Sequence, residues 1–319
     1  MDYDHKRLLI KAARLYYEQD MTQAQIAEHL RLSRQKTQRI LEEAREKGVV
    51  SITIHPITEI YSDLEEGLEK RYGLSEALIV ETTDPNNQNV IAREVGAGAA
   101  EYLTRVIRPN DKVVLSWGNS LLGMVSSLNA TSHTQVRNLQ LIQGLGGLGD
   151  PNVAIHGAEL VRRAARALGA LAVLFPAPAI AATKALRDAI YRDSYVAHTL
   201  ELARSANLAF VGIGSSDNDS IAVPDLWRFL PRSVLPNLLK KGAVGSINLR
   251  YFDRNGQLVP SEINDRIIGL TLDEFKRIPR VVGIAGGSAK VEAIRAALRA
   301  KLLNVLVTDN ITATMLLEK

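Results

Sequence analysis

Three short segments carry glycine together with hydroxyl, amide or charged side chains directly after apolar runs, where strands would end. The segment GGSAK, residues 286–290, places two glycines, a serine and Lys290 at the start of a helical pattern. Such a helix start is suited to binding an anion such as phosphate. Ser116 to Asn119 and Asp309 follow two other apolar runs. Because the carboxyl ends of parallel strands share one edge of a sheet, these segments are predicted to converge on a ligand.

Each segment also has a plainer interpretation. Trp117 would otherwise be a core residue, and Lys290 would be a solvated surface charge. The predicted convergence of several turns favours the ligand-binding interpretation over these separate ones.

A fourth segment, IQGLGGLGDPN, carries the spacing G-x-G-x-x-G at Gly144, Gly146 and Gly149. This spacing binds dinucleotides when a strand precedes it, a helix follows it and an acidic residue stands about 20 positions further on. A strand and a helix are predicted on either side, but ALAVLFPAPA, at that distance, has no acid to hold an adenine ribose. NAD or NADP is therefore disfavoured. A tight turn without a ligand stays open, and a small phosphorylated or hydroxylated ligand is preferred.

The first fifty residues predict three short helices. Apolar residues recur at helical spacing in the first of them, at Leu8, Leu9, Ala12, Leu15 and Tyr16. Thr22 and Gln25 form the capping-box pattern of a second helix. Ser33 caps a third helix that ends at Gly48. With a tight turn at Arg31-Leu32, the second and third helices predict a helix-turn-helix, followed by a strand in residues 49–56 that would form a wing.

The predicted third helix concentrates DNA-binding chemistry in its first turns. Arg and Lys can donate to guanine or neutralise phosphates, and Gln can pair bidentately with adenine. The residues predicted to contact DNA are Thr22, Gln23, Ser33, Arg34, Gln35, Lys36, Gln38 and Arg39. A solvated helix face is the alternative. It would explain neither the two caps at this spacing nor the position of the bases ahead of Glu42, Glu43 and Glu46.

The length, composition and net charge of the chain limit the classes of protein to which it can belong. The chain has 319 residues, of which 46% are hydrophobic and 23% charged, enough for one large and one small domain. It has no cysteine, no apolar run that would span a bilayer and no signal-peptide pattern at its start, which favours the cytoplasm. A net charge of +4 is only mildly basic, so a nucleic-acid role depends on local arrangement.

The larger part of the chain predicts an α/β fold. Seven short apolar runs alternate with helical patterns, at residues 77–81, 112–118, 139–144, 171–175, 208–214, 280–287 and 304–309. This alternation is typical of a mostly parallel, Rossmann-like sheet covered by helices. Residues 180–205 are predicted only as paired helices or a hairpin. The domain prediction is a DNA-binding domain at 1–56, a connecting or dimerising helix at 57–73 and an effector domain at 74–319.

These motifs, in their order and spacing, resemble the SorC family of sugar-responsive bacterial transcriptional regulators over nearly the whole chain. The resemblance is carried by the helix-turn-helix segment, by SWG and GLGG, and by AVGSINLRYFDRNGQ, INDRIIGL, GIAGGSAKVEAIRAAL and NVLVTDNITA. It implies a helix-turn-helix joined to an effector domain similar to sugar-phosphate isomerases, assembly as dimers and tetramers, and control of a catabolic operon by a sugar phosphate.

The resemblance also implies where the effector binds. The GGSAK turn would receive the phosphate, and the other segments would surround the sugar. Together with His156, which lies close to the glycine turn, the predicted effector-binding residues are Ser116, Trp117, Gly118, Asn119, Gly146, Gly147, His156, Ser246, Gly286, Gly287, Ser288, Lys290 and Asp309. His156 has an equally good alternative as a surface residue at a helix start.

Three residues depart from the family pattern. Ser246 stands where the family usually has Asp, so a carboxylate expected near the sugar is missing. Leu145 stands where some relatives have a lysine able to form a Schiff base, which disfavours a covalent effector at that turn. Gln38 replaces a small Ser common before Arg39, which suggests a different operator sequence.

We therefore expect a transcriptional regulator that binds operator DNA, a sugar-phosphate effector and other copies of itself, as a homodimer or homotetramer, and does not bind a membrane. No catalytic residue, metal site or cofactor is predicted. The alternative from another class is a sugar-phosphate isomerase-like enzyme on the same scaffold. The scattered histidines disfavour it, because they form no acid-base pair at the strand ends.

Overall fold

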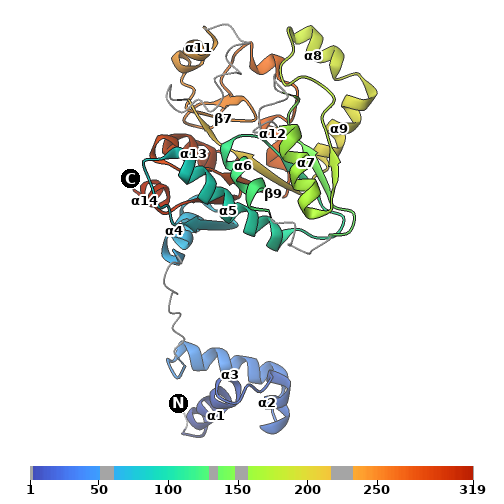
Figure 1. The fold of residues 1–319 in the computed structure, drawn as a ribbon. Helices are drawn as coiled ribbons and strands as arrows, with labels where there is room; N and C mark the ends of the chain where they lie inside the picture. Colours follow the sequence, from blue (N-terminus) through green and yellow to red (C-terminus); the bar gives the residue numbers. More distant parts are fainter. Residues whose placement is uncertain (1–2, 51–60, 129–135, 148–156, 217–232, 319) are drawn as a thin grey trace. The chain divides into compact units, whose positions relative to one another are not determined.

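The computed structural model describes residues 3–50, 61–128, 136–147, 157–216 and 233–318. The chain forms two compact units, Met1–Ile57 and Thr58–Lys319, and each is considered by itself (Figure 1). Most of the predicted wing, in residues 49–56, lies outside the described residues, as do Gly149 and His156.

The first unit is a bundle of three helices, α1 (Tyr3–Tyr17), α2 (Gln23–His29) and α3 (Arg34–Glu46). Their inner faces form one apolar core from Leu9, Ala12, Ala13, Leu15, Ile26, Ile40, Leu41 and Ala44. Both predicted caps are confirmed. Thr22 and Gln25 complete the capping box of α2, and the Ser33 hydroxyl accepts the backbone N–H of Lys36 at 3.2 Å at the start of α3. These caps satisfy orphan N–H groups and fix where the two helices begin.

The second unit is built on ten described strands and the helices between them. The strands are β1 (Glu76–Val80), β2 (Lys112–Leu115), β3 (Gln140–Gln143), β4 (Leu171–Val173), β5 (Leu208–Gly212), β6 (Gly214–Ser215), β7 (Gly245–Ile247), β8 (Arg250–Phe252), β9 (Arg280–Ile284) and β10 (Val305–Asp309). The α-helices are α4 (Ser62–Tyr72), α5 (Gln88–Val106), α6 (Asn119–Ser127), α7 (Gly157–Leu168), α8 (Lys184–Ile190), α9 (Ser194–Arg204), α11 (Val234–Lys240), α12 (Leu272–Arg277), α13 (Val291–Arg299) and α14 (Asn310–Leu317). Two 3-10 turns are η2 (Asn264–Arg266) and η3 (Ser288–Lys290).

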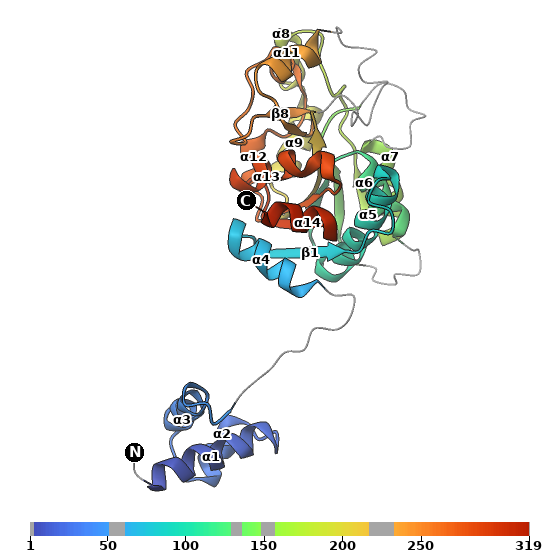
Figure 2. The same cartoon turned by 90° about the vertical axis from the view of Figure 1, so that its left-hand side faces the viewer.

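All seven predicted strands are confirmed and form one parallel sheet in the order β1-β10-β9-β5-β2-β3-β4. Successive residues of a strand point to opposite faces, so Val113 and Leu115 join one apolar core while Val114 joins the other. Helices α5, α6 and α7 cover the first face, and α9, α12, α13 and α14 cover the second (Figure 2). The sheet is therefore buried on both faces, as parallel sheets are.

The strand order places a topological switch point between β2 and β5, because the chain runs outward through β3 and β4 and then returns to the other side of β2. Ligands of such folds bind at the carboxyl ends of the strands beside this point. The turn after β2, which begins at Ser116, occupies the position at which dinucleotide-binding folds hold a pyrophosphate. The glycine turn from Gly144 follows the next strand, β3, which is a second physical reason against a dinucleotide there.

A second, antiparallel sheet of β6, β7 and β8 was not among the sequence predictions. Its strands have only two or three residues each, so they carry too little alternation to be recognised. Residues 180–205, predicted as paired helices or a hairpin, form the helices α8 and α9. Helix α4, within the predicted connecting segment 57–73, packs against β1 and α14 of its own unit. A linking or dimerising role for it stays a prediction.

Candidate effector-binding site and DNA-binding helix

The turns that follow β9 and β10 are joined by hydrogen bonds. The N–H of Gly287 donates to Oδ2 of Asp309 at 2.9 Å and to Oγ1 of Thr312 at 2.7 Å. Gly287 has φ of +98°, and a Cβ on Gly286 would stand 2.2 Å from Asp309 Oδ2. Only glycine therefore fits this close approach to the carboxylate.

Asp309 is buried and caps helix α14. Its Oδ1 accepts the N–H of Thr312 at 2.8 Å, and its Oδ2 accepts the Thr312 hydroxyl at 2.6 Å. Together with the Gly287 bond, these contacts satisfy the buried carboxylate within the protein. The structure thus gives Asp309 a role in holding the turn, and direct contact of Asp309 with an effector stays a prediction.

Lys290 is a half-buried cation in the same turn. Burial lowers the pKa of its ammonium from 10.5 to about 8. Its backbone N–H donates to the carbonyl of Gly287 at 2.9 Å, but its ammonium has no hydrogen-bond or ion-pair partner among the described residues. Ser288, two residues earlier, is exposed. A desolvated ammonium without a counter-ion gains most from an anionic ligand, because the ligand would supply the charge that the protein does not.

Gln88, the first residue of α5, contacts this turn and was not among the residues predicted from the sequence. Its Nε2 donates to the carbonyl of Gly286 at 3.0 Å, and a Cβ on Gly287 would lie 2.4 Å from its Oε1. Asn87 caps helix α5 directly before it. The capping residue marked a helix start in the sequence, but only the strand order brings the start of α5 beside the end of β9.

A second cluster joins the end of β2 to the glycine turn after β3. The Ser116 hydroxyl donates to Oδ1 of Asn248, and Asn248 Nδ2 donates to the carbonyl of Gly144 at 3.1 Å. Ser116 and Asn248 are both buried. Since the Ser116 O–H donates its hydrogen bond to Asn248, the Ser116 oxygen can still accept a hydrogen bond from another donor.

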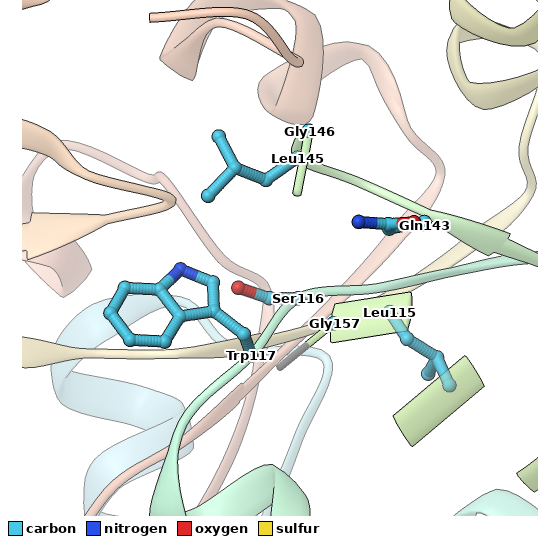
Figure 3. Close-up of a pocket in the computed structure, with 7 residues that line it drawn as sticks. All are labelled: Leu115, Ser116, Trp117, Gln143, Leu145, Gly146 and Gly157. Carbon is cyan, nitrogen blue, oxygen red and sulfur yellow. The ribbon is translucent and has the colours of Figure 1, made fainter. Parts of the chain in front are cut away.

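A small pocket lies at this cluster. It is lined by Leu115, Ser116, Trp117, Gln143, Leu145, Gly146 and Gly157. Figure 3 shows the Ser116 hydroxyl beside the indole of Trp117, with Leu145 and the amide of Gln143 also lining the pocket. The Gln143 Oε1 accepts the N–H of Phe175 at 3.1 Å, so its NH₂ group faces the pocket as a donor. One acceptor and one donor beside an indole suit a hydroxylated ligand.

Asn248 and Arg250, like Gln143, were not predicted. Asn248 and Leu249 have φ of +49° and +61° and form the tight two-residue turn between β7 and β8. Left-handed φ at both central residues is the type I′ geometry that suits such hairpins. Asn suits this turn, whereas a bulky Leu there is strained. The Asn was therefore a turn signal in the sequence, although the Leu after it hid the pattern.

The buried Arg250 holds in place the loop of residues 264–268, which is hydrogen-bonded to the glycine turn. Its guanidinium donates to the carbonyl of Asn264 at 2.5 Å and to that of Ile267 at 3.2 Å. Burial lowers the pKa of this group. The carbonyl of Ile268, in the same loop, accepts the N–H of Gly146 at 3.0 Å. Arg250 thus supports the glycine turn from behind, through backbone contacts.

The paired glycines have different surroundings. A Cβ on Gly146 would stand 2.3 Å from the carbonyl oxygen of Pro178, whereas on Gly147 the nearest atom would be 3.8 Å away. Gly147 is also bonded to the same strand segment, through its N–H to Ala177 at 2.8 Å. Gly146 is therefore needed for packing. Leu145, at the position of the family's lysine, is buried in an apolar cluster.

Ser246 lies on the second sheet, opposite Gly214, and is half-buried. Its Oγ would be 2.8 Å from a Cβ on Gly214. Strand β7 contacts α13, and β6 contacts η3, so this sheet lies against the GGSAK segment. Gly118, with φ of +114°, starts helix α6 at Asn119. Of the predicted residues, Ser116 lies in one hydrogen-bonded cluster and Gly287 and Asp309 lie in the other, both at the carboxyl ends of the parallel strands, whereas Ser246 lies on the second sheet and His156 lies outside the described residues.

In the first unit, helix α3 separates an apolar face from a basic one. Thr37, Ile40, Leu41 and Ala44 are buried, whereas Arg34, Gln35, Lys36, Gln38 and Arg39 are exposed. Within residues 3–50 the structure gives no ion pair to Arg34, Lys36 or Arg39. Gln38 Nε2 donates to Oε1 of Glu42 at 2.9 Å, and Glu43 is engaged by His5 and Lys47. Glu42 and Glu43 are thus bonded to partners other than Arg34, Lys36 and Arg39.

Comparisons with known proteins agree with this geometry. Residues 58–318 match the model of the family described as a sugar-binding domain. The chain is 33% identical to the deoxyribonucleoside regulator of Bacillus subtilis and 31% identical to the sorbitol operon regulator of Klebsiella pneumoniae, with 99% of each chain covered in both cases. The crystal structure of the full-length sorbitol operon regulator SorC from Klebsiella pneumoniae matches with a TM-score of 0.73, at 30% identity and 100% coverage of both chains.

A helix-turn-helix on the same chain as a sugar-binding, Rossmann-like unit defines a ligand-responsive transcriptional regulator. With the family match over residues 58–318 and relatives above 30% identity over its full length, the chain belongs to the SorC family of sugar-responsive transcriptional regulators.

Proposed function

We propose that this protein binds operator DNA through the first turns of α3 and that a phosphorylated sugar, bound at the strand ends of the second unit, changes its affinity for that DNA. The observation that carries the DNA part is the set of exposed bases at Arg34, Lys36 and Arg39, which lie on a helix whose start is capped by Ser33 and have no ion-pair partner within residues 3–50. Such a helix start can enter the major groove and contact base edges and phosphates.

Lys290 supports the phosphate part of the proposal. The ammonium is half-buried in a turn that begins a helix, where backbone N–H groups lack intrahelical acceptors. A phosphate placed there would pair with Lys290 and accept from the Ser288 hydroxyl and the first N–H groups of the helix. The sugar would then extend toward the cluster of Ser116, Gln143 and Asn248.

The residues named for direct effector contact, the assembly into dimers or tetramers and a cytoplasmic location all belong to this proposal. We also propose that the chain is not an enzyme. The buried carboxylate of Asp309 at the strand ends accepts three internal hydrogen bonds, which is the arrangement of a helix cap and not of a free general base. In the described part of the chain, no helix is long and apolar enough to span a bilayer.

The test of the DNA part uses duplexes selected by the full-length protein from a random library. The triple variant R34A/K36A/R39A should lose at least about 10-fold in affinity, since one base contact alone is worth roughly 1–3 kcal/mol. A charge-matched control, R108A/K184A/R299A, removes three exposed bases of the second unit. It should bind the selected DNA within about twofold of the unaltered protein. Equal losses in both variants would mean that only net charge matters, and no loss in either would contradict the assignment of α3.

A further inference from the structure

We propose that helix α14 couples the effector site to the segment leading into the DNA-binding unit, through a relay in which Gly287 is hydrogen-bonded to Asp309 and the next residue, Asn310, is hydrogen-bonded to Tyr61. This proposal rests on the proposed function and adds the residues through which effector binding in the second unit would change DNA binding. It is carried by contacts at both ends of α14, which begins after β10, is hydrogen-bonded at its start to the GGSAK turn, and packs against α4 (Figure 2).

At its first end, α14 is tied to the effector turn. The Gly287 N–H is shared between the side chains of Asp309 and Thr312, which are the cap and third residue of the helix. A phosphate near Lys290 would bring negative charge to a turn whose amide already serves a buried carboxylate. Like charges repel strongly where water is scarce, so an occupied turn and the empty turn would favour different positions of the Asp309 cap.

Asn310, the residue after Asp309, contacts residues outside the effector turn. Asn310 Nδ2 donates to the hydroxyl of Tyr61 at 3.2 Å, and Asn310 Oδ1 accepts the N–H of Thr82 at 3.2 Å. Tyr61 stands immediately before α4 and is its N-cap residue. The chain that precedes Tyr61 runs back to the helix-turn-helix. The Asp309 cap is therefore separated from Tyr61 by one peptide bond, to Asn310, and one side-chain hydrogen bond.

At its second end, α14 is fastened to the end of α4. Arg71 donates to the carbonyl of Leu317 at 2.7 Å, and the Tyr72 hydroxyl donates to that of Leu316 at 2.9 Å. Gly67, inside α4, allows close packing against the last residue of α14, because a Cβ there would lie 3.0 Å from the side chain of Leu317. Two helices held at both ends and packed this closely move together, so displacement of α14 is passed to α4.

The variant Tyr61→Phe tests the relay, because it removes one hydroxyl and keeps the ring. The control is Tyr195→Phe, on an exposed side chain of α9. The probes are five- and six-carbon sugar phosphates and polyol phosphates, from which the compound that most changes DNA binding by the unaltered protein is used. Fluorescence anisotropy gives DNA affinity with and without this compound, and calorimetry gives the affinity for the compound alone.

We expect Tyr61→Phe to bind the compound and the DNA separately within about twofold of the unaltered protein. The compound's effect on DNA affinity should fall at least about fivefold, within the range of ordinary allosteric couplings. Asn310→Ala, a second variant of the same contact, should do the same, and Tyr195→Phe should leave the effect unchanged. An unchanged effect in both relay variants would overturn the proposal. Failure of the proposed function would instead show in the unaltered protein, as DNA binding that no phosphorylated sugar alters.

Discussion

At the scale of single residues, the lowered pKa of Lys290 predicts that binding at the proposed effector site depends on pH, which an ordinary lysine would not cause. Its ammonium has a pKa of about 8 in the empty site, and a bound phosphate favours the protonated form. Binding therefore takes up a proton above pH 8, and affinity falls as pH rises, by up to tenfold per pH unit. Calorimetry of a sugar phosphate from pH 7 to 9.5 measures this slope.

Lys290→Arg is the matched variant for this measurement, because arginine stays protonated throughout the range. Its affinity should be flat with pH, while that of the unaltered protein declines. Lys290→Ala should weaken the phosphorylated sugar by roughly 10- to 100-fold and its unphosphorylated counterpart little, as expected for loss of a charged contact. The phosphate would bind elsewhere if the affinity of Lys290→Arg fell with pH as steeply as that of the unaltered protein. It would also bind elsewhere if Lys290→Ala lost equal affinity for the phosphorylated and the unphosphorylated sugar.

Ser246 tests the placement of the second sheet beside the effector. A serine hydroxyl donates and accepts, whereas aspartate only accepts and adds a negative charge. We expect Ser246→Asp to weaken a sugar bisphosphate through like-charge repulsion and to spare or improve a monophosphate. The order of the two changes, measured by calorimetry, is the test. If both ligands change equally, or neither changes, Ser246 does not face the effector.

At the scale of elements, the two glycines of the turn after β3 are expected to differ in role, because Gly146 is needed for packing and Gly147 is not. Gly146→Ala would place a Cβ 2.3 Å from the carbonyl oxygen of Pro178, so it should destabilise the protein by at least about 1–3 kcal/mol. Gly147→Ala has open space and no positive φ, so it should leave the midpoint of thermal unfolding nearly unchanged. If Gly147 faces the effector, the same variant lowers effector affinity. Equal destabilisation by both variants would show that the turn is not packed as described.

The elements also show which parts of the fold a sequence can reveal. The seven strands of the parallel sheet were predictable because buried strands are uninterrupted apolar runs bounded by turn residues. The caps at Thr22 and Ser33 were predictable because capping is local in sequence. The small sheet was not, since its strands are too short to show a period, and contacts such as Gln88 with Gly286 depend on strand order. Asn248 carried a local turn signal, but its contact with Ser116 joins residues far apart in the sequence.

At the scale of the whole molecule, control of DNA binding by an effector requires two sites on one chain that influence each other. Linkage makes the influence reciprocal, so an effector that weakens DNA binding must itself bind less tightly when DNA is present, by the same factor. Two copies of the helix-turn-helix in a dimer would further require two half-sites on the DNA, separated by about one helical turn or a multiple of it. Residues 3–50 alone should therefore bind the selected DNA much more weakly than the full chain.

The most direct test measures the affinity of the full-length protein for its selected DNA by fluorescence anisotropy, with and without a panel of sugar phosphates and their unphosphorylated counterparts. The account predicts that at least one phosphorylated sugar changes the DNA affinity by about 5-fold or more, the size of an ordinary allosteric coupling, while its unphosphorylated counterpart does not. In the Lys290→Ala variant this response should be lost, although the DNA is bound as before. Specific DNA binding that no phosphorylated sugar alters, or an equal response to both forms of the sugar, would contradict it.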